Sequence, residues 1–237
     1  MRPMPDANLI SQVQVLRERG LSPKAIAKAL KIRPAEAQEL IRASAEQRDA
    51  VAPISPLVGC WLSAGWSCGL RWKGHSDWPA DPGSTSDEPM LAQVLVARKH
   101  RYGEVTVGGF LVDAACLGVK AAMKPRQVEE TELPQVVEMA FSAFDDGCRQ
   151  VPLDLAQHLV LGAVDYARRL GFEPDPDYER CRPLLGEFTG PSEIEFGFLG
   201  KPYFVAGPRD DVQEIMATLR RTVGDKKFEF LVPVGLG

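Results

Sequence analysis

Apolar side chains recur at helical spacing in three short segments within the first fifty residues of the chain. The first segment, residues 7–19, carries its apolar side chains at mixed three- and four-residue spacings, at Ile10, Val13, Val15 and Leu16. Residues at such spacings share one face of an α-helix. The pattern predicts a short amphipathic helix that Gly20 ends.

A second helix is predicted directly after this glycine. Ser22 offers a side-chain oxygen that can cap the first turn, and Pro23 occupies the first helical position, where a missing amide hydrogen costs nothing. Its apolar stripe is formed by Ala25, Ile26, Ala29 and Leu30. After a break at residues 31–33, Pro34 opens a third predicted helix with apolar residues at Ala37, Leu40, Ile41 and Ala45.

The segment from Gly20 to Leu30 resembles the first half of a bacterial helix-turn-helix. Ala27 is the small residue that lets two helices cross closely, and Ile32 fills the turn. The resemblance covers residues 20–45 and implies a trihelical module whose third helix enters a major groove. The side chains expected to contact bases or phosphates are Lys28, Arg33, Gln38 and Arg42.

The third predicted helix also carries negative charge. Glu36 faces outward as a further candidate contact, and Glu39 adds a second carboxylate to the same helix. Carboxylates repel phosphates, so a trihelical unit for protein contact or dimerisation is the alternative interpretation of this module.

Beyond residue 56 the periodicity alternates between strands and helices. Residues 92–98 and 105–113 predict a β-hairpin, and residues 133–145 and 153–170 predict two helices, the second ended by Gly171. The last part predicts strands at 194–198, 203–206 and 228–234, with a helix at 211–222 between the last two strands. A finish of this kind is βαβ-like and indicates a mixed sheet covered by helices.

These patterns divide the chain into two domains. The helix-turn-helix module occupies residues 1–50 and the larger domain residues 57–237, with a proline-containing hinge at residues 48–56. The predicted fold class is α+β: an N-terminal trihelical helix-turn-helix followed by a mixed-sheet α/β domain.

The clearest candidate for a catalytic site is a set of three residues that begins at the end of the hairpin. Asp113, Cys116 and Lys120 stand three and four positions apart, and on a helix they would share one face. A nearby ammonium group lowers the pKa of a thiol, so the set offers a nucleophile with an activating cation. In the alternative interpretation Cys116 is a small buried hydrophobic residue, Asp113 caps the helix and Lys120 is solvated.

The same region carries a second resemblance. The blocks from Gly109 to Asp113, from Cys116 to Lys120 and from Gly200 to Tyr203 are similar to recurring blocks of a bacterial family of uncharacterised proteins. The similarity covers most of residues 92–234. It implies a common fold and no particular reaction.

Charge separates the two predicted domains. The whole chain has a net charge of -4, but residues 1–50 hold nine Lys and Arg against six Asp and Glu, so the excess of acidic residues lies entirely in the remainder. Phosphate contacts need concentrated positive charge. A nucleic-acid surface is therefore expected at the N-terminus.

The cysteines and histidines give no local signature of a metal site or a cofactor. The 5 cysteines contain no CxxC pair and the 3 histidines no HExxH motif, and no GxGxxG or GxxxxGK[ST] pattern is present. No apolar run reaches the length of a membrane span, and the N-terminus lacks a secretory signal, so we expect no membrane association and a cytoplasmic location.

All 4 tryptophans fall within residues 57–78. Such a cluster can form a stacking platform for single-stranded nucleic acid, although core packing is the commoner use of tryptophan. The sequence as a whole predicts a nucleic-acid-associated binding or regulatory protein, with DNA or RNA as partner. The alternatives are an enzyme, a hydrolase or transferase, with a site near Asp113, Cys116 and Lys120, or an adaptor that binds a ribosome or another protein.

Overall fold

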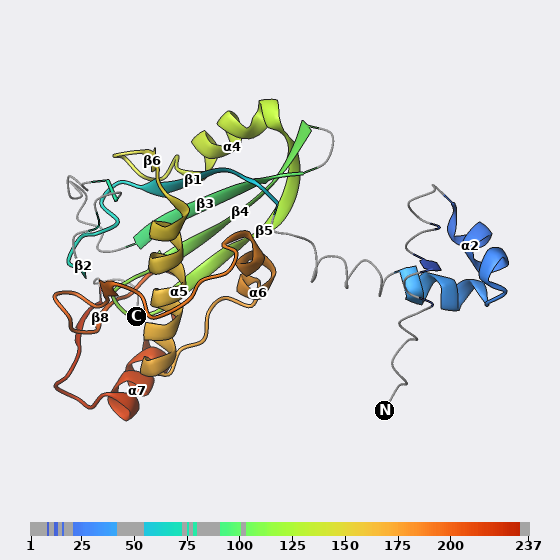
Figure 1. Ribbon diagram of the computed structural model, residues 1–237. Helices are drawn as coiled ribbons and strands as arrows, with labels where there is room; N and C mark the ends of the chain where they lie inside the picture. Colours follow the sequence, from blue (N-terminus) through green and yellow to red (C-terminus); the bar gives the residue numbers. More distant parts are fainter. Residues whose placement is uncertain are drawn as a thin grey trace. The chain divides into compact units, whose positions relative to one another are not determined.

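The computed structural model describes residues 21–41, 55–72, 91–100 and 103–232, together with the single residues 9, 12, 13, 16, 75, 78 and 79 (Figure 1). The chain forms two compact units, Met1–Pro53 and Ile54–Gly237. Each unit has its own hydrophobic cluster and is described by itself.

The N-terminal unit contains helix α2, Pro23–Leu30, and a second helix at residues 34–41. Ser22 caps α2 as expected, because its Oγ accepts a hydrogen bond from the backbone N–H of Ala25 at 3.3 Å. Lys31 ends the helix in the left-handed conformation, at φ 57°, and the backbone N–H of Ile32 turns back to donate to the carbonyl of Ala27 at 3.0 Å.

The apolar stripes indicated most of the buried residues of this unit, but in α2 Ala27 is buried and Ala29, which the predicted stripe included, is exposed. The buried residues are Val13, Ile26, Ala27, Ala37 and Leu40, and Leu9, Leu16, Leu21, Leu30, Ile32 and Ile41 pack against them. The first predicted helix, residues 7–19, lies largely outside the described residues, although residues 9, 12, 13 and 16 are helical. Two short helices are thus described, and the complete trihelical module stays a prediction.

The larger unit is built on a five-stranded sheet with the order β5-β4-β3-β1-β6. Its strands are β1 (Leu57–Ser63), β3 (Leu91–Lys99), β4 (Glu104–Asp113), β5 (Gly118–Glu129) and β6 (Cys148–Gln150). Every pairing in this sheet is antiparallel. The expected hairpin is confirmed as β3 and β4, which pair without a register shift from Leu91 opposite Asp113 to Lys99 opposite Val105.

Helices cover both faces of the sheet, as Figure 1 shows for α5 (Leu153–Leu170) running across the strands. Alternate strand residues explain this. Val94, Val96 and Phe110 face α5, whereas their neighbours Leu95 and Ala97 face α4 (Leu133–Ala140), which follows the short 3-10 helix η2 (Glu130–Glu132). The period of two along a strand places its side chains on opposite faces of the sheet.

The C-terminal part forms two small sheets beside the large one. β2 (Arg71–Trp72) pairs with β7 (Ile194–Glu195), and β8 (Tyr203–Val205) pairs in parallel with β9 (Glu229–Leu231) across the helix α7 (Val212–Thr222). Between α5 and β7 lie the short helices α6 (Tyr178–Cys181) and η3 (Arg182–Leu184). The βαβ arrangement predicted for the C-terminal part is therefore present.

Two expectations need correction. The larger unit is α+β as predicted, but its main sheet is antiparallel rather than mixed, because the parallel β8–β9 pair forms a separate sheet. Residues 114–117 form a turn and residues 118–129 form β5, so Asp113, Cys116 and Lys120 do not share one face of a helix. Gly118 permits this turn, with φ at +71° and its α-carbon so close to α5 that an added Cβ would lie 2.7 Å from the Cβ of Ala167.

Within the described part of the chain, no helix is long and apolar enough to cross a bilayer.

Candidate functional site

Helix α2 of the N-terminal unit presents a basic stripe. Lys24 and Lys28 stand four positions apart, so they share one side of the helix, and both are exposed. Lys31, the residue that ends the helix, is exposed as well. Ile26, on the opposite side of the helix, is buried, and so is Ala27. The packing of Ile26 therefore leaves the ammonium groups of Lys24 and Lys28 toward solvent.

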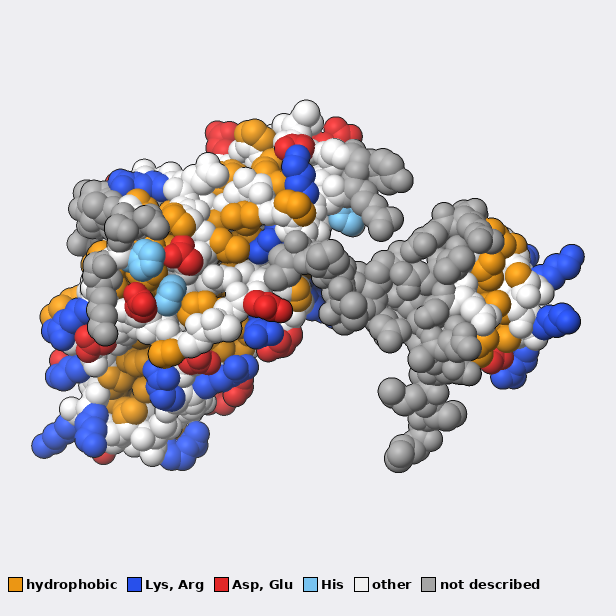
Figure 2. Space-filling model, viewed as in Figure 1, with side chains coloured by type: hydrophobic (Ala, Val, Ile, Leu, Met, Phe, Trp, Pro, Cys, Tyr) orange, Lys and Arg blue, Asp and Glu red, His pale blue; other side chains and the backbone are white. Residues whose placement is uncertain are grey.

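The helix at residues 34–41 continues the exposed surface. Arg33, just before this helix, has an 88% exposed side chain, and its Nε lies 3.8 Å from Oε2 of Glu36. Gln38 and Glu39 are exposed, while Ala37 and Leu40 point into the unit. Of the four expected contact residues, Lys28, Arg33 and Gln38 are thus on the surface, and Arg42 lies outside the described residues. Figure 2 shows Lys and Arg side chains projecting from this unit.

Asp113 occupies a structural position at the end of β4. One carboxylate oxygen, Oδ1, accepts hydrogen bonds from the backbone N–H groups of Ala115 and Cys116, each at 2.9 Å, and so holds the turn into β5. Burial raises the pKa of this carboxyl group to about 6, against the opposing effects of the Lys120 charge and of the backbone N–H donors.

Cys116 and Lys120 do not form the activated pair that their spacing suggested. The Cys116 side chain is fully buried, and burial together with the neighbouring Asp113 raises the pKa of its thiol. The ammonium of Lys120 is bound by Oδ2 of Asp210 at 2.6 Å, and that oxygen also accepts the backbone N–H of Gly207 at 2.8 Å. A protonated, buried thiol is a poor nucleophile, so these contacts favour a structural role for the set.

Two of the tryptophans are buried in the core of the larger unit, and the other two are partly buried. Trp66 and Trp78 are 3% and 6% exposed, and the ring of Trp66 lies 5.2 Å from that of Trp72 and 6.4 Å from that of Trp78. A stacking platform for bases needs exposed ring faces. The buried rings therefore support core packing as the main role of this segment.

Trp78 also joins two histidines that the sequence keeps far apart. The His75 ring stacks on Trp78 with centroids 5.1 Å apart, and the His158 ring meets the Trp78 ring edge to face at 5.2 Å. The carboxylate of Asp154 accepts the indole N–H of Trp78 at 3.1 Å and lies 3.9 Å from Nε2 of His75. In the described residues no group of three or more His, Cys, Asp or Glu side chains is placed to hold a metal ion.

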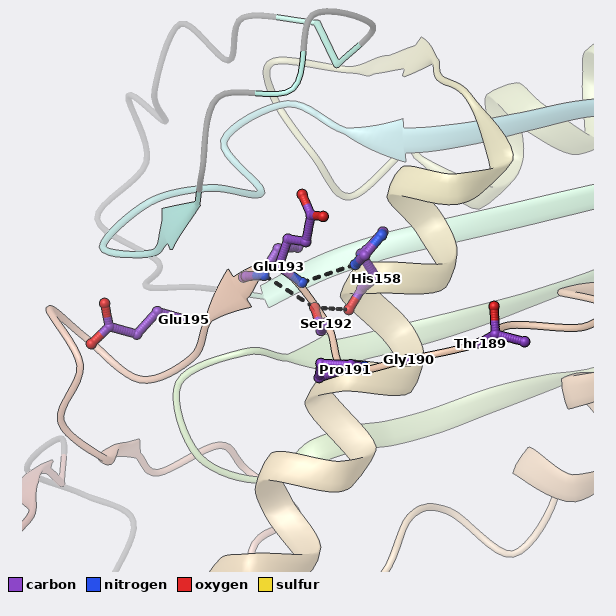
Figure 3. Close-up of a pocket in the computed structure, with 8 residues that line it drawn as sticks. His158, Thr189, Gly190, Pro191, Ser192, Glu193 and Glu195 are labelled. Carbon is purple, nitrogen blue, oxygen red and sulfur yellow. Dashed lines mark hydrogen bonds between the residues drawn. The ribbon is translucent and has the colours of Figure 1, made fainter.

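A pocket of about 530 Å³ opens beside His158 (Figure 3). Its wall is the segment 189–195, which is tied to α5 through His158. The hydroxyl of Ser192 donates to the backbone carbonyl of His158 at 2.8 Å, and the backbone N–H of Glu193 donates to Nδ1 of the His158 ring at 3.0 Å. Ser192, His158 and Asp154 thus lack the contacts of a catalytic triad, since the hydroxyl donates to the histidine backbone instead of its ring.

Neither the family models, nor the curated proteins, nor the solved structures include a match to this chain. The resemblances of residues 20–45 to a helix-turn-helix and of residues 92–234 to a bacterial family therefore stay predictions.

Proposed function

We propose that this protein binds duplex DNA through its N-terminal unit and acts as a nucleic-acid-associated regulatory protein. The observation that carries the proposal is a group of exposed basic side chains on α2 and in the turn after it, Lys24, Lys28, Lys31 and Arg33. Several ammonium and guanidinium groups on a small helical unit are suited to a phosphate backbone.

The binding geometry follows from a helix-turn-helix arrangement. The lysines of α2 contact phosphates, and the helix beginning at residue 34 enters the major groove as the third helix of a trihelical module. Gln38 supplies both a donor and an acceptor, which suits an adenine edge, and Arg42 suits guanine or phosphate. Lys28, Arg33, Gln38 and Arg42 are thus the proposed contact residues.

The charge balance of the module limits its specificity. Glu39 is exposed on the reading helix, and Glu36 compensates part of the charge of Arg33. Contacts to phosphate, which carry no sequence information, therefore supply most of the affinity. The acidic larger unit does not contribute to this affinity, because its net charge repels phosphate.

The test is a titration of the full-length protein with a fluorescent random-sequence duplex at several salt concentrations. The logarithm of the binding constant should fall steeply with the logarithm of salt. K24A/K28A should make that slope shallower by about 1.8, at about 0.9 for each phosphate that the variant no longer neutralises. Alanine keeps the helix intact, since it has the highest helix propensity.

A matched control removes the same charge elsewhere. Lys226 and Lys227 are exposed in the larger unit, so K226A/K227A should leave the slope unchanged. Equal effects of the two double variants, or binding that does not depend on salt, would contradict the proposal. Binding to single-stranded or duplex RNA in preference to duplex DNA would replace the DNA assignment, and retention of a ribosome or protein at low salt without nucleic acid would favour the adaptor.

A further inference from the structure

The pocket wall of the larger unit depends on the protonation state of one imidazole. Nδ1 of His158 accepts the backbone N–H of Glu193 at 3.0 Å, so Nδ1 carries no proton. In a neutral imidazole the proton then resides on Nε2. The observed geometry therefore requires the neutral ring.

Protonation of the ring would turn this contact into a conflict. Both nitrogens of an imidazolium are donors, so a proton on Nδ1 would face the N–H of Glu193. The ring has little room to turn away, because it lies between Trp78, 5.2 Å away, and Phe188, 4.8 Å away, centroid to centroid. The repulsion between the two N–H groups is relieved when the backbone at Glu193 moves away from α5.

We propose that His158 is a pH-sensitive latch that holds the backbone at Glu193 on α5 and releases it when the imidazole is protonated. This inference concerns the larger unit and does not depend on DNA binding by the N-terminal unit. After release, Glu193 no longer holds its place in the wall of the pocket, so the pocket is complete only in the neutral state.

The groups around His158 set the direction of the switch. Burial lowers the pKa of His158, and a protonated His75 lowers it further, whereas the carboxylates of Glu193 and Asp154 raise it. Asp154 lies on α5 itself, His75 in the segment before Trp78, and Glu193 on the latched segment. Because burial is the largest of these effects, His158 is neutral and the latch is closed at neutral pH. The latch opens at a pH below the range in which histidines ordinarily titrate.

The other attachments of the segment show what would remain after release. Ser192 Oγ donates to the carbonyl of His158 at 2.8 Å and accepts the N–H of Ile194 at 3.2 Å, and neither contact titrates. Before the pocket, Nε2 of Gln157 donates to the carbonyls of Leu185 and Glu187 at 2.7 and 2.9 Å. On the C-terminal side, β7 stays paired with β2. The opening is therefore local to Glu193, with the chain held on both sides of it.

The experiment follows amide hydrogen exchange and the imidazole nitrogens of the full-length protein by NMR from about pH 7.5 to about pH 5. After correction for the intrinsic pH dependence of exchange, the protection of the Glu193 amide should fall about tenfold for each unit by which the His158 pKa lies below its ordinary value. The Nδ1 signal should show an unprotonated nitrogen at neutral pH and titrate together with this loss.

The variant H158N tests whether titration of the imidazole, and not the packing of the side chain, causes the loss of protection. The Oδ1 of asparagine can take the place of Nδ1 as an acceptor but does not titrate, so protection should persist throughout the pH range. H100N is the matched control: His100 contacts Thr106 and Gln127, and its replacement should leave the pH dependence at Glu193 unchanged. The proposal is overturned if H158N loses protection with pH as the wild type does, or if Nδ1 is protonated at neutral pH.

Discussion

Asp113 and Lys120 both have ionisable side chains that are largely shielded from solvent. Asp113 is 6% exposed and holds the turn into β5, and Lys120 finds its partner Asp210 in the loop before α7. A buried charge is tolerated when it is paired and hydrogen-bonded. The same two residues that suggested catalysis by their spacing therefore connect β4, β5 and the C-terminal part.

Asp113 should make the stability of the larger unit depend on pH. Its pKa is raised from an ordinary 3.8 to about 6, so the folded state binds more protons than the unfolded state between these values. The stabilisation is full below the unfolded pKa and is lost as pH rises through the folded pKa, in total about 3 kcal/mol at about 1.4 kcal/mol per pKa unit.

Urea unfolding of wild type and D113N from about pH 4 to about pH 7 measures this contribution. The asparagine side chain of this variant would keep an acceptor oxygen for the two backbone N–H groups but cannot titrate, so the stability of the variant should decline less over the interval. An identical decline in both proteins would show that another group is responsible.

Helix α5 organises the larger unit at the scale of elements. It packs against β1, β4 and β5 through its buried side, and its other contacts fasten the segment 185–195. Gly162 lies where that segment crosses the helix, since an added Cβ would lie 2.5 Å from the Cβ of Ser192 and 2.6 Å from Cε2 of Phe196. The close crossing brings Ser192 and Glu193 within hydrogen-bonding distance of His158.

Gly162→Ala should therefore destabilise the protein, although the same change in an exposed helix stabilises by about 1 kcal/mol. The overlap with Ser192 and Phe196 costs about 1–3 kcal/mol, and we expect the net effect to lower the thermal midpoint by a few degrees. Asp165→Ala, on the exposed side of α5, is the control and should leave the midpoint the same or slightly higher. A midpoint raised equally by both changes would argue against the close crossing.

At the scale of the whole molecule the chain is two units with separate hydrophobic clusters and opposite charge tendencies. The N-terminal unit is small and basic, and it carries the proposed DNA contacts. The larger unit is acidic and contains the pocket beside His158. This division would place the proposed nucleic-acid binding and the proposed response to pH in different units.

A fragment consisting of residues 54–237 should fold by itself, because its core clusters are formed from its own residues. Its thermal unfolding by circular dichroism should reproduce the transition that the full chain shows for the larger unit, and its affinity for the duplex should be lost. Failure of the fragment to unfold cooperatively would show that the N-terminal unit is needed for its stability.

Much of the local structure could be predicted from the sequence, because it depends on neighbours along the chain. The cap formed by Ser22 and Pro23, the hairpin of β3 and β4, the long helix α5 ended by Gly171 and the order β8, α7, β9 are all confirmed. The exposed positions of Lys28, Arg33 and Gln38 also followed from the apolar stripes, since a buried stripe fixes the opposite face of a helix.

Contacts between distant parts of the chain required the tertiary structure. The spacing of Asp113, Cys116 and Lys120 fits a helix, but strand pairing with β4 and the close packing of Gly118 on α5 made this stretch a turn and a strand. The antiparallel order of the main sheet and the meeting of His75, Trp78 and His158 likewise have no local signal. Sequence periodicity reports which face of an element is buried, whereas only the packed fold decides what that face meets.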